Sequence, residues 1–192
     1  MQMLLFLFIV LFLLFIIALF AFPAFSPIPY FPTNKYDLPA IIKALNLKKD
    51  QVILDLGAGD GIVIFCAASM TYKQKLNTQF VAIDINPILI IILYIRRLLH
   101  PNRKNIKIIW GDMFEVKLKS QNSKVKSITI YLYISPWLLE KAVTKIKKDF
   151  KNFSASWRIV SYFYPVKSLK AKEKIIIGKN RIYSYFINSE AR

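Results

Sequence analysis

Residues 52–61 read VILDLGAGDG, a short apolar run that carries Asp55 and leads into three glycines at every second position. The chain has 192 residues and only five glycines, and Gly57, Gly59 and Gly61 are three of them. Glycine allows a sharp turn and lets the backbone approach a ligand closely. We therefore interpret this stretch as a buried strand, a ligand-binding turn and the beginning of a helix.

The spacing of these glycines argues against two common phosphate sites. A P-loop requires Lys followed by Ser or Thr, and a dinucleotide fingerprint has the spacing G-x-G-x-x-G. Here the spacing is G-x-G-x-G, with Asp55 before it and Asp60 inside it. Carboxylates beside a pyrophosphate would repel it. The turn instead favours a ligand with a cationic or amino end.

Two further carboxylates stand at the ends of predicted strands. Asp84 closes FVAID (80–84) and Asp112 closes IKIIWGD (106–112). In an open parallel sheet, ligands bind at the carboxyl ends of the strands, where the strand order reverses. A carboxylate there can accept hydrogen bonds from ribose hydroxyls or from an adenine amino group. An amino end, a ribose and an adenine together describe S-adenosylmethionine.

The rest of the chain alternates between strand and helix patterns. We predict strands at 51–56, 80–84, 106–112, 127–135 and 157–165, helices at 37–47, 62–70, 87–99 and 136–150, and a hairpin at 174–188. This alternation predicts an α/β fold, with a parallel sheet, helices on both faces and an antiparallel edge.

At this point the chain resembles a known family. The set DLGAGDG, AIDINP and WGDMF resembles class I S-adenosylmethionine-dependent methyltransferases over about residues 33–188. The resemblance implies a Rossmann-like seven-stranded methyltransferase sheet. It also implies the cofactor contacts: Asp55, Gly57, Ala58, Gly59 and Gly61 for the methionine part, Asp84, Ile85 and Asn86 for the ribose, and Asp112 and Met113 for the adenine.

A closer resemblance covers more of the sequence. PYFPT, DINP, GDMF, YLYISPWLLEKAV and IVSYFYP resemble the small membrane-anchored protein-lysine methyltransferases of the ATP synthase c subunit and adenine nucleotide carrier type. That group also has a hydrophobic N-terminal segment. The chain departs from it at 154–156, where a glycine is usual, and at Asp84, where Glu is common. The resemblance implies a lysine acceptor in a protein, and the substrate rests on analogy alone.

The acceptor site is predicted at the exit of the fourth strand. We expect Ser135, Pro136 and Trp137 to line it, while Tyr131 and Tyr133 could be acceptor aromatics or ordinary core residues. An apolar, aromatic channel favours the neutral amine of lysine. Enzymes that methylate the exocyclic amines of bases usually have Asp or Asn before the prolines at this strand end, and this chain has Ile134. No general base is assigned.

The first residues predict a membrane anchor. Residues 3–22 are apolar and uncharged, long enough for one span, and no basic segment precedes them as in a signal peptide. We predict an anchor over 1–24, a Pro-rich linker over 25–36 and a methyltransferase domain over 37–192. Because Lys and Arg follow the span, the positive-inside rule predicts a single-pass protein with its catalytic domain on the cytoplasmic side.

The charge leaves several partners open. The net charge is +17, and residues 96–192, with 22 Lys/Arg and 6 Asp/Glu, carry +16 of it. Anionic lipid headgroups, nucleic acid and a biased composition would each explain it, and nucleic acid is the least favoured. With one Cys and one His, the sequence predicts no zinc cluster. A lipid or quinone methyltransferase, an RNA methyltransferase and an inactive tethered cofactor-binding module remain as alternatives.

Overall fold

The N-terminal segment is a helix. The computed structural model of the chain describes residues 2–21, 30–118, 125–151, 153 and 156–187. The first of these ranges is helix α1 (Gln2–Ala21). In the part of the chain that the structure describes, no helix is both long and apolar enough to cross a bilayer. The structure thus confirms a helix at this position but does not support the predicted transmembrane span.

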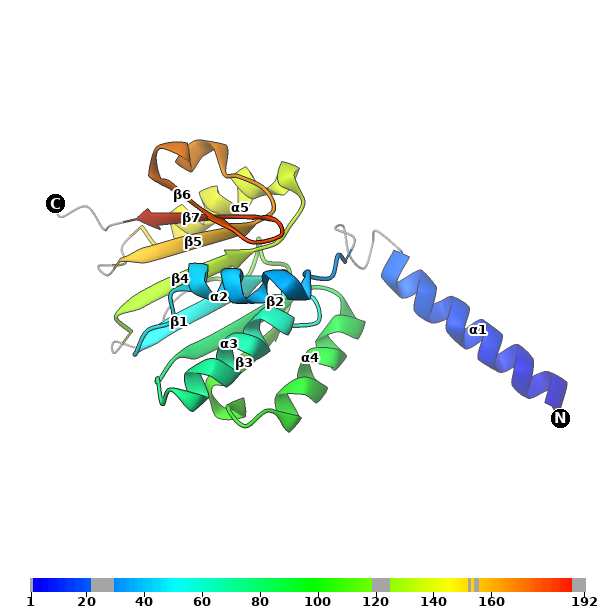
Figure 1. The fold of residues 1–192 in the computed structure, drawn as a ribbon. Coiled ribbons are helices and arrows are strands. Elements are labelled where there is room, and N and C mark those ends of the chain that lie inside the picture. The colour runs from blue at the N-terminus through cyan, green and yellow to red at the C-terminus, as the bar shows by residue number, and fades with distance from the viewer. Residues whose placement is uncertain (1, 22–29, 119–124, 152, 154–155, 188–192) are drawn as a thin grey trace.

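One sheet organises the rest of the described residues (Figure 1). Its order is β3-β2-β1-β4-β5-β7-β6. The strands are β1 (Gln51–Leu56), β2 (Gln79–Asp84), β3 (Ile106–Trp110), β4 (Ser127–Leu132), β5 (Trp157–Tyr162), β6 (Glu173–Ile177) and β7 (Arg181–Ile187). The first five run parallel, and β7 is antiparallel to β5 and β6. The predicted α/β sheet with an antiparallel edge is therefore confirmed.

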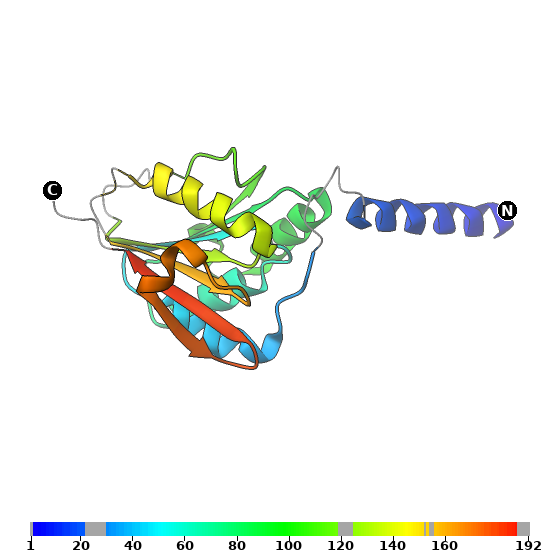
Figure 2. The same ribbon diagram turned by 90° about the horizontal axis from the view of Figure 1, so that it is seen from above.

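Helices cover both faces of this sheet, as Figure 2 shows for α2 and α5. The helices are α2 (Leu38–Leu45), α3 (Ile62–Lys73), α4 (Pro87–Leu99) and α5 (Pro136–Asp149). Short 3-10 helices occupy Lys35–Asp37, Arg103–Asn105 and Lys167–Lys172. Side chains of α2, α3 and α4 pack into one core cluster, and those of α5 pack into the other.

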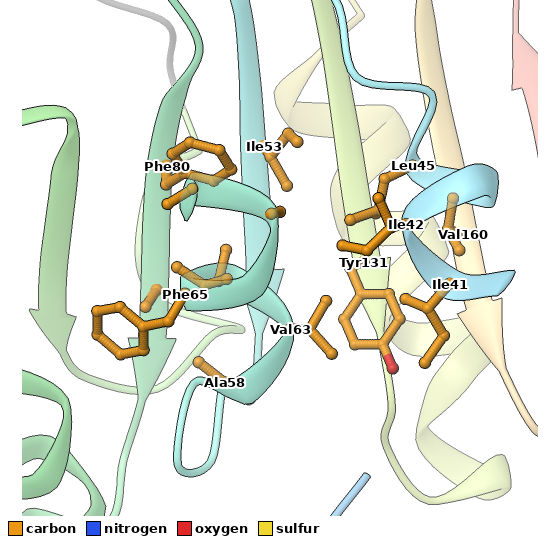
Figure 3. Packing of buried hydrophobic residues seen from close by; sticks show 14 of the residues in the cluster. Ile41, Ile42, Leu45, Ile53, Ala58, Val63, Phe65, Phe80, Tyr131 and Val160 are labelled. Carbon is orange, nitrogen blue, oxygen red and sulfur yellow. The ribbon is translucent and has the colours of Figure 1, made fainter. Parts of the chain in front are cut away.

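The sheet has an apolar core on each face. On the first face, Figure 3 shows Tyr131 of β4 among side chains that include Val63 of α3 and Ile41 of α2. On the second face, Leu139 and Val143 of α5 pack with residues of β4 and β5. Because both faces are covered, all six residues of the central strand β1 are buried, its polar ones included.

Local sequence explains where α4 begins. The side-chain oxygen of Asn86 accepts hydrogen bonds from the backbone N–H groups of Ile88, at 2.9 Å, and Leu89, at 3.4 Å. Pro87 occupies the first helical position, where its missing N–H is not needed. The helix predicted at 87–99 is confirmed at both ends.

Several strands end earlier than the sequence predicted. β3 ends at Trp110 rather than 112, and the chain bends at Gly111, whose N–H still donates to the Asp84 carbonyl of β2 at 2.9 Å. β4 ends at Leu132 rather than 135, and β5 ends at Tyr162 rather than 165, before Phe163 with a φ of 77°. The residues after these strands therefore belong to loops at the carboxyl edge of the sheet.

A buried carboxylate ties the N-terminal part of the domain to the C-terminal hairpin. Asp37 is fully buried and accepts hydrogen bonds from the Tyr162 hydroxyl and from the Asn180 side chain, each at 2.7 Å, and from the Lys179 N–H. Burial by itself would raise the pKa of Asp37, but these hydrogen bonds outweigh it and lower the pKa. The clamp holds the chain just before α2 against the hairpin.

Candidate functional site

A cleft opens at the carboxyl edge of the sheet, where the strand order reverses between β1 and β4. It encloses about 870 Å³, including open solvent at its mouth. Its walls come from the loops after β1, β2, β3 and β4 and from the segment before α2. The lining residues are Tyr30, Phe31, Thr33, Asp55, Gly57, Ala58, Gly59, Asp60, Ile62, Val63, Ile83, Asp84, Ile85, Leu89, Gly111, Asp112, Met113, Phe114, Tyr131, Tyr133 and Ile134.

The loop after β1 needs its glycines for conformation and for space. Gly59 has a φ of 59°, and a Cβ added there would lie 2.7 Å from the ring of Tyr30. Gly61 has a φ of 75°, and a Cβ there would lie 2.4 Å from the Leu93 side chain. Both values of φ are in the left-handed region that favours glycine. Gly59 lines the cleft, whereas Gly61 lies below it and lets α3 begin close to α4.

Asp84 joins the glycine loop to the end of β2. The carboxylate is 7% exposed and accepts hydrogen bonds from the N–H groups of Gly59, at 2.8 Å, and Asn86, at 2.9 Å. Burial raises the pKa of Asp84, and the backbone hydrogen bonds lower it in part. Each oxygen keeps further acceptor capacity toward the cleft. Ile85 lines the cleft beside Asp84, while Asn86 caps α4 and lies outside the lining.

Asp55 is the most unusual group in the cleft. It is 2% exposed, and no described residue gives its Oδ1 a hydrogen bond. Burial, with the nearby carboxylates of Asp84 and Asp60, raises the pKa of Asp55 well above its usual range. A buried carboxylate oxygen without a partner is costly. An amino or cationic group of a ligand in the cleft would relieve that cost, as the sequence predicted.

Asp60 does not contribute in the way the sequence suggested. We expected it to add negative charge toward a cationic ligand, but its carboxylate pairs with Arg96 at 2.8 Å. Arg96 also donates to the Asp60 carbonyl. Asp60 thus lines the cleft as one half of an ion pair. Asp55 and Asp84 are the buried carboxylates that remain for a ligand.

The far wall, after β3, is more apolar. Met113 is 8% exposed, and Phe114, Ile85 and Leu89 lie along the same cleft. Asp112 accepts a hydrogen bond from the Phe114 N–H at 2.8 Å, which fixes the turn that presents both residues. An apolar slot with a carboxylate at its rim can hold a flat heterocycle that carries an amino group. The structure thus brings together eight of the ten predicted cofactor residues, all but Gly61 and Asn86.

The segment before α2 was missed as part of the site. The sequence placed residues 25–36 in a linker, yet Tyr30, Phe31 and Thr33 line the cleft. Burial, followed by the Asp60 carboxylate, raises the pKa of Tyr30 to about 12, so its hydroxyl stays a hydrogen-bond donor. The one available signal was the aromatic PYFPT stretch, which the family resemblance had already singled out without giving it a role.

The end of the cleft near β4 is lined by aromatic and apolar side chains. Tyr131, Tyr133 and Ile134 line it. Burial is the main cause that raises the pKa of both tyrosine hydroxyls, which therefore stay neutral at physiological pH. Ser135, Pro136 and Trp137, predicted for this wall, instead begin α5 outside the lining, and Trp137 is 72% exposed. Their acceptor role stays a prediction.

The chain is similar to known proteins in sequence and in structure. No family model matches the chain. In sequence it is similar to a protein-lysine N-methyltransferase from Saccharolobus islandicus (strain REY15A), with 26% identity over 169 residues, 83% of this chain and 94% of that protein. In structure it is similar to an RNA methyltransferase from Salinibacter ruber in complex with S-adenosyl-L-homocysteine. That match has a TM-score of 0.65 and 22% identity, and covers 84% of this chain and 97% of the other.

A further structural relative is M. capricolum TrmK in complex with its natural cofactor product, S-adenosyl-homocysteine. The TM-score is 0.51 and the identity 17%, over 83% of this chain and 70% of that one. The chain therefore has the fold of class I S-adenosylmethionine-dependent methyltransferases. The cleft fits that cofactor because its buried unpartnered carboxylate, its second carboxylate and its apolar slot offer partners to an amino end, a ribose and an adenine.

Proposed function

We propose that this chain, an S-adenosylmethionine-dependent methyltransferase, transfers the methyl group to the side-chain amine of a lysine in a protein. The similarity to a protein-lysine N-methyltransferase along 94% of that protein's length is the observation that carries the choice of acceptor. The neutral aromatic end of the cleft supports it independently.

The cofactor would lie along the carboxyl edge of the sheet. Asp55 would accept from its amino end, Asp84 from its ribose hydroxyls, and Asp112 with Met113 would border its adenine. When bound, S-adenosylmethionine supplies a methyl group activated by the sulfonium, so the protein mainly positions the nucleophile and excludes water. The backbone hydrogen bonds to Asp84 suit that task, because they hold its carboxylate in one position for the cofactor.

Lysine must lose its proton before its amine can attack. The proton leaves to water, the nitrogen forms a bond to the methyl carbon, and the carbon–sulfur bond breaks. An apolar site lowers the pKa of a lysine amine because it disfavours the charged form. Tyr131, Tyr133 and Ile134 form such a site, and the raised pKa values of the two tyrosines keep negative charge away from it.

The same end fits a nucleobase poorly. The sequence predicted that a base-methylating enzyme would place an Asp or Asn where this chain has Ile134. Ile134 is 5% exposed, and its side chain packs 3.3 Å from the position of a Cβ on Gly57. An exocyclic amine there would find no side-chain acceptor at position 134.

The acceptor is identified by following the methyl group. The full chain is incubated with S-adenosylmethionine labelled in its methyl group and with membrane and soluble cell fractions, and protein, lipid extract and RNA are counted separately. We expect label in protein, released as methyl-lysine on acid hydrolysis, and much less of it with Asp84→Asn at the same cofactor concentration. Label confined to the lipid extract or to RNA would replace lysine with those acceptors.

We also propose that the protein is attached to a membrane, with its methyltransferase domain on the cytoplasmic side. The uncharged sequence of α1, whose side chains from Met3 to Ile17 are mostly exposed, and the basic residues after it support this location. When a cell lysate is separated by flotation at moderate salt, the chain should float with the membranes, and protease added outside intact cells should not cut it. Recovery of the chain in the soluble fraction alone would contradict the attachment.

A further inference from the structure

Helix α4 has an apolar face on each side. Its inner side packs into the core through Leu89, Ile90 and Leu93. Its outer side carries a second apolar stripe at helical spacing, with exposed fractions from 45% to 83%. The members of this outer stripe are Ile91, Tyr94, Ile95, Leu98 and Leu99. Positions three and four apart share one face of a helix, so these five side chains form a continuous ridge.

The fold does not require such a surface. Helix α5 covers the opposite face of the same sheet and is also amphipathic, but its outer side exposes Lys141, Thr144, Lys147 and Lys148. A solvated outer face of this kind is the ordinary arrangement for a surface helix. The outer stripe of α4 therefore calls for a partner that the described residues do not supply.

Positive charge surrounds the outer stripe. Residues 87–107 contain five Lys/Arg and no Asp/Glu, and since Arg96 pairs with Asp60, the positive charge beside the stripe comes from Arg97, Arg103, Lys104 and Lys107. Arg97 donates to the Ile106 carbonyl at 2.6 Å, and Arg103 donates to the Leu98 carbonyl at 3.3 Å, which holds both at the carboxyl end of the helix. At the other end Trp110 is 65% exposed, and its Nε1 donates to the Ile85 carbonyl at 2.9 Å. Basic side chains and an exposed Trp thus flank an apolar ridge.

We propose that the outer stripe of α4 lies on an anionic lipid surface, with the helix in the plane of the headgroups. A helix of 13 residues is about 20 Å long, too short to span a bilayer but suited to its surface. Interfacial helices combine an apolar face with Lys/Arg on their flanks and Trp or Tyr at the boundary. Anionic headgroups complement the basic residues here.

A second copy of the chain fits this surface less well. Most homodimers are two-fold, so the same patch would face itself. The basic residues beside the outer stripe would then meet their own counterparts across the interface, without acidic residues from 87–107 to neutralise them. Lipid headgroups supply the opposite charge without that conflict.

The contact would place the cleft at the bilayer surface. Leu89, in the first turn of α4, lines the cleft, and Ile91 begins the outer stripe two residues later. A lipid-bound α4 would therefore hold the cleft mouth near headgroup level, where lysines at the ends of membrane-embedded segments are found. The lipid contact itself does not depend on which acceptor is methylated.

A spin label on the outer stripe tests the proposal in the full chain. Cys66, the one cysteine, is replaced by Ala, or by Ser if Cys66→Ala fails to fold, and Leu98→Cys then carries the label. Thr144→Cys on the outer side of α5 is the matched control. Both are reconstituted into vesicles of phosphatidylcholine with phosphatidylglycerol and of phosphatidylcholine alone. Relaxation by oxygen, which enters lipid, and by a water-soluble nickel chelate measures the depth of each label.

We expect the label at 98 to lie ~5–10 Å below the headgroups in anionic vesicles and nearer the water in neutral ones. The label at 144 should stay in water in both. A label at 98 as accessible to nickel as the label at 144 would overturn the proposal. So would a label at 98 shielded from both reagents, which would indicate a protein contact, or equal depth in the two kinds of vesicle, which would remove the role of anionic lipid.

Discussion

The two ends of the cleft solve opposite electrostatic problems. At the cofactor end, Asp55 and Asp84 are buried carboxylates, and Asp55 lacks a hydrogen-bond partner for one oxygen. At the acceptor end, Tyr131 and Tyr133 have hydroxyls kept neutral by burial. Carboxylates thus lie where a ligand brings amino and hydroxyl groups, and the side chains that line the acceptor end are themselves neutral. Substitutions at one end should change cofactor affinity, and those at the other should change acceptor turnover.

Asp84→Asn should give the largest effect, and chiefly on cofactor binding. The amide cannot replace the charge that supports hydrogen bonds from the ribose, so the affinity for S-adenosylmethionine should fall by ~1.5–3 kcal/mol, or about 10- to 150-fold. Titration calorimetry measures it. The matched control is Asp50→Asn, at the opposite end of β1, where the carboxylate lies 3.7 Å from Lys126. Equal affinities for the Asp84 variant and the unaltered chain would remove Asp84 from the ribose site.

Tyr133→Ala should reverse that pattern. Tyr133 lines the cleft and packs edge-on against Tyr162, with ring centroids 4.7 Å apart. Removing the ring admits water to the amine, so kcat/KM for the protein acceptor should fall about tenfold, or ~1.4 kcal/mol. Cofactor affinity should change less than about twofold.

Tyr133→Phe separates the ring from its hydroxyl. If the apolar wall is what matters, this variant should keep most of the acceptor turnover. A loss of cofactor affinity equal to the loss of turnover in Tyr133→Ala would mean that the two ends of the cleft are not independent.

The sequence was sufficient for the parts of the site that are local. The strand before Asp55, the glycine spacing and the Asn86-Pro87 start of α4 each depend on a few neighbouring residues, and the structure confirms these elements where they were predicted. The carboxyl ends of parallel strands meet at one edge, so Asp55, Asp84 and Asp112 could be expected to come together.

The parts that were missed depend on contacts between distant residues. Arg96 neutralises Asp60 from 36 positions away, and Asp37 binds Asn180 from 143 positions away. No local pattern encodes either pairing. Trp137 was expected at the acceptor wall because it follows β4, but α5 begins at Pro136 and leaves the indole outside the cleft lining.

Asp55→Asn tests whether the buried carboxylate is maintained for a ligand. Because the pKa of Asp55 is raised in the fold, the folded chain keeps the proton of Asp55 to a higher pH than the unfolded chain does. The free energy of unfolding therefore falls as the pH rises above the ordinary carboxyl pKa. Without ligand, Asn should stabilise the fold by ~1 kcal/mol at about pH 8, or ~2–4 °C in the melting temperature.

The advantage should shrink as the pH falls, because Asp55 then becomes protonated in the folded and the unfolded chain alike. Thermal unfolding of both proteins, from about pH 8 down to the ordinary carboxyl pKa, measures this difference in stability. S-adenosylmethionine should restore stability to the unaltered chain alone. A variant less stable than the unaltered chain at high pH would mean that Asp55 stabilises the empty fold.

Trp137→Ala should have the smallest effect and decides where the acceptor end stops. The indole is 72% exposed and lies outside the cleft lining, so its loss should change acceptor kcat/KM by less than about twofold and leave the melting temperature within ~1 °C. Acceptor kcat/KM is measured for Trp137→Ala and Tyr133→Ala in the same assay, so that the two losses can be compared. If Trp137→Ala lowers turnover as much as Tyr133→Ala does, the acceptor protein contacts the first turn of α5 as well. The neutral aromatic wall would then extend beyond the cleft, as the sequence first predicted.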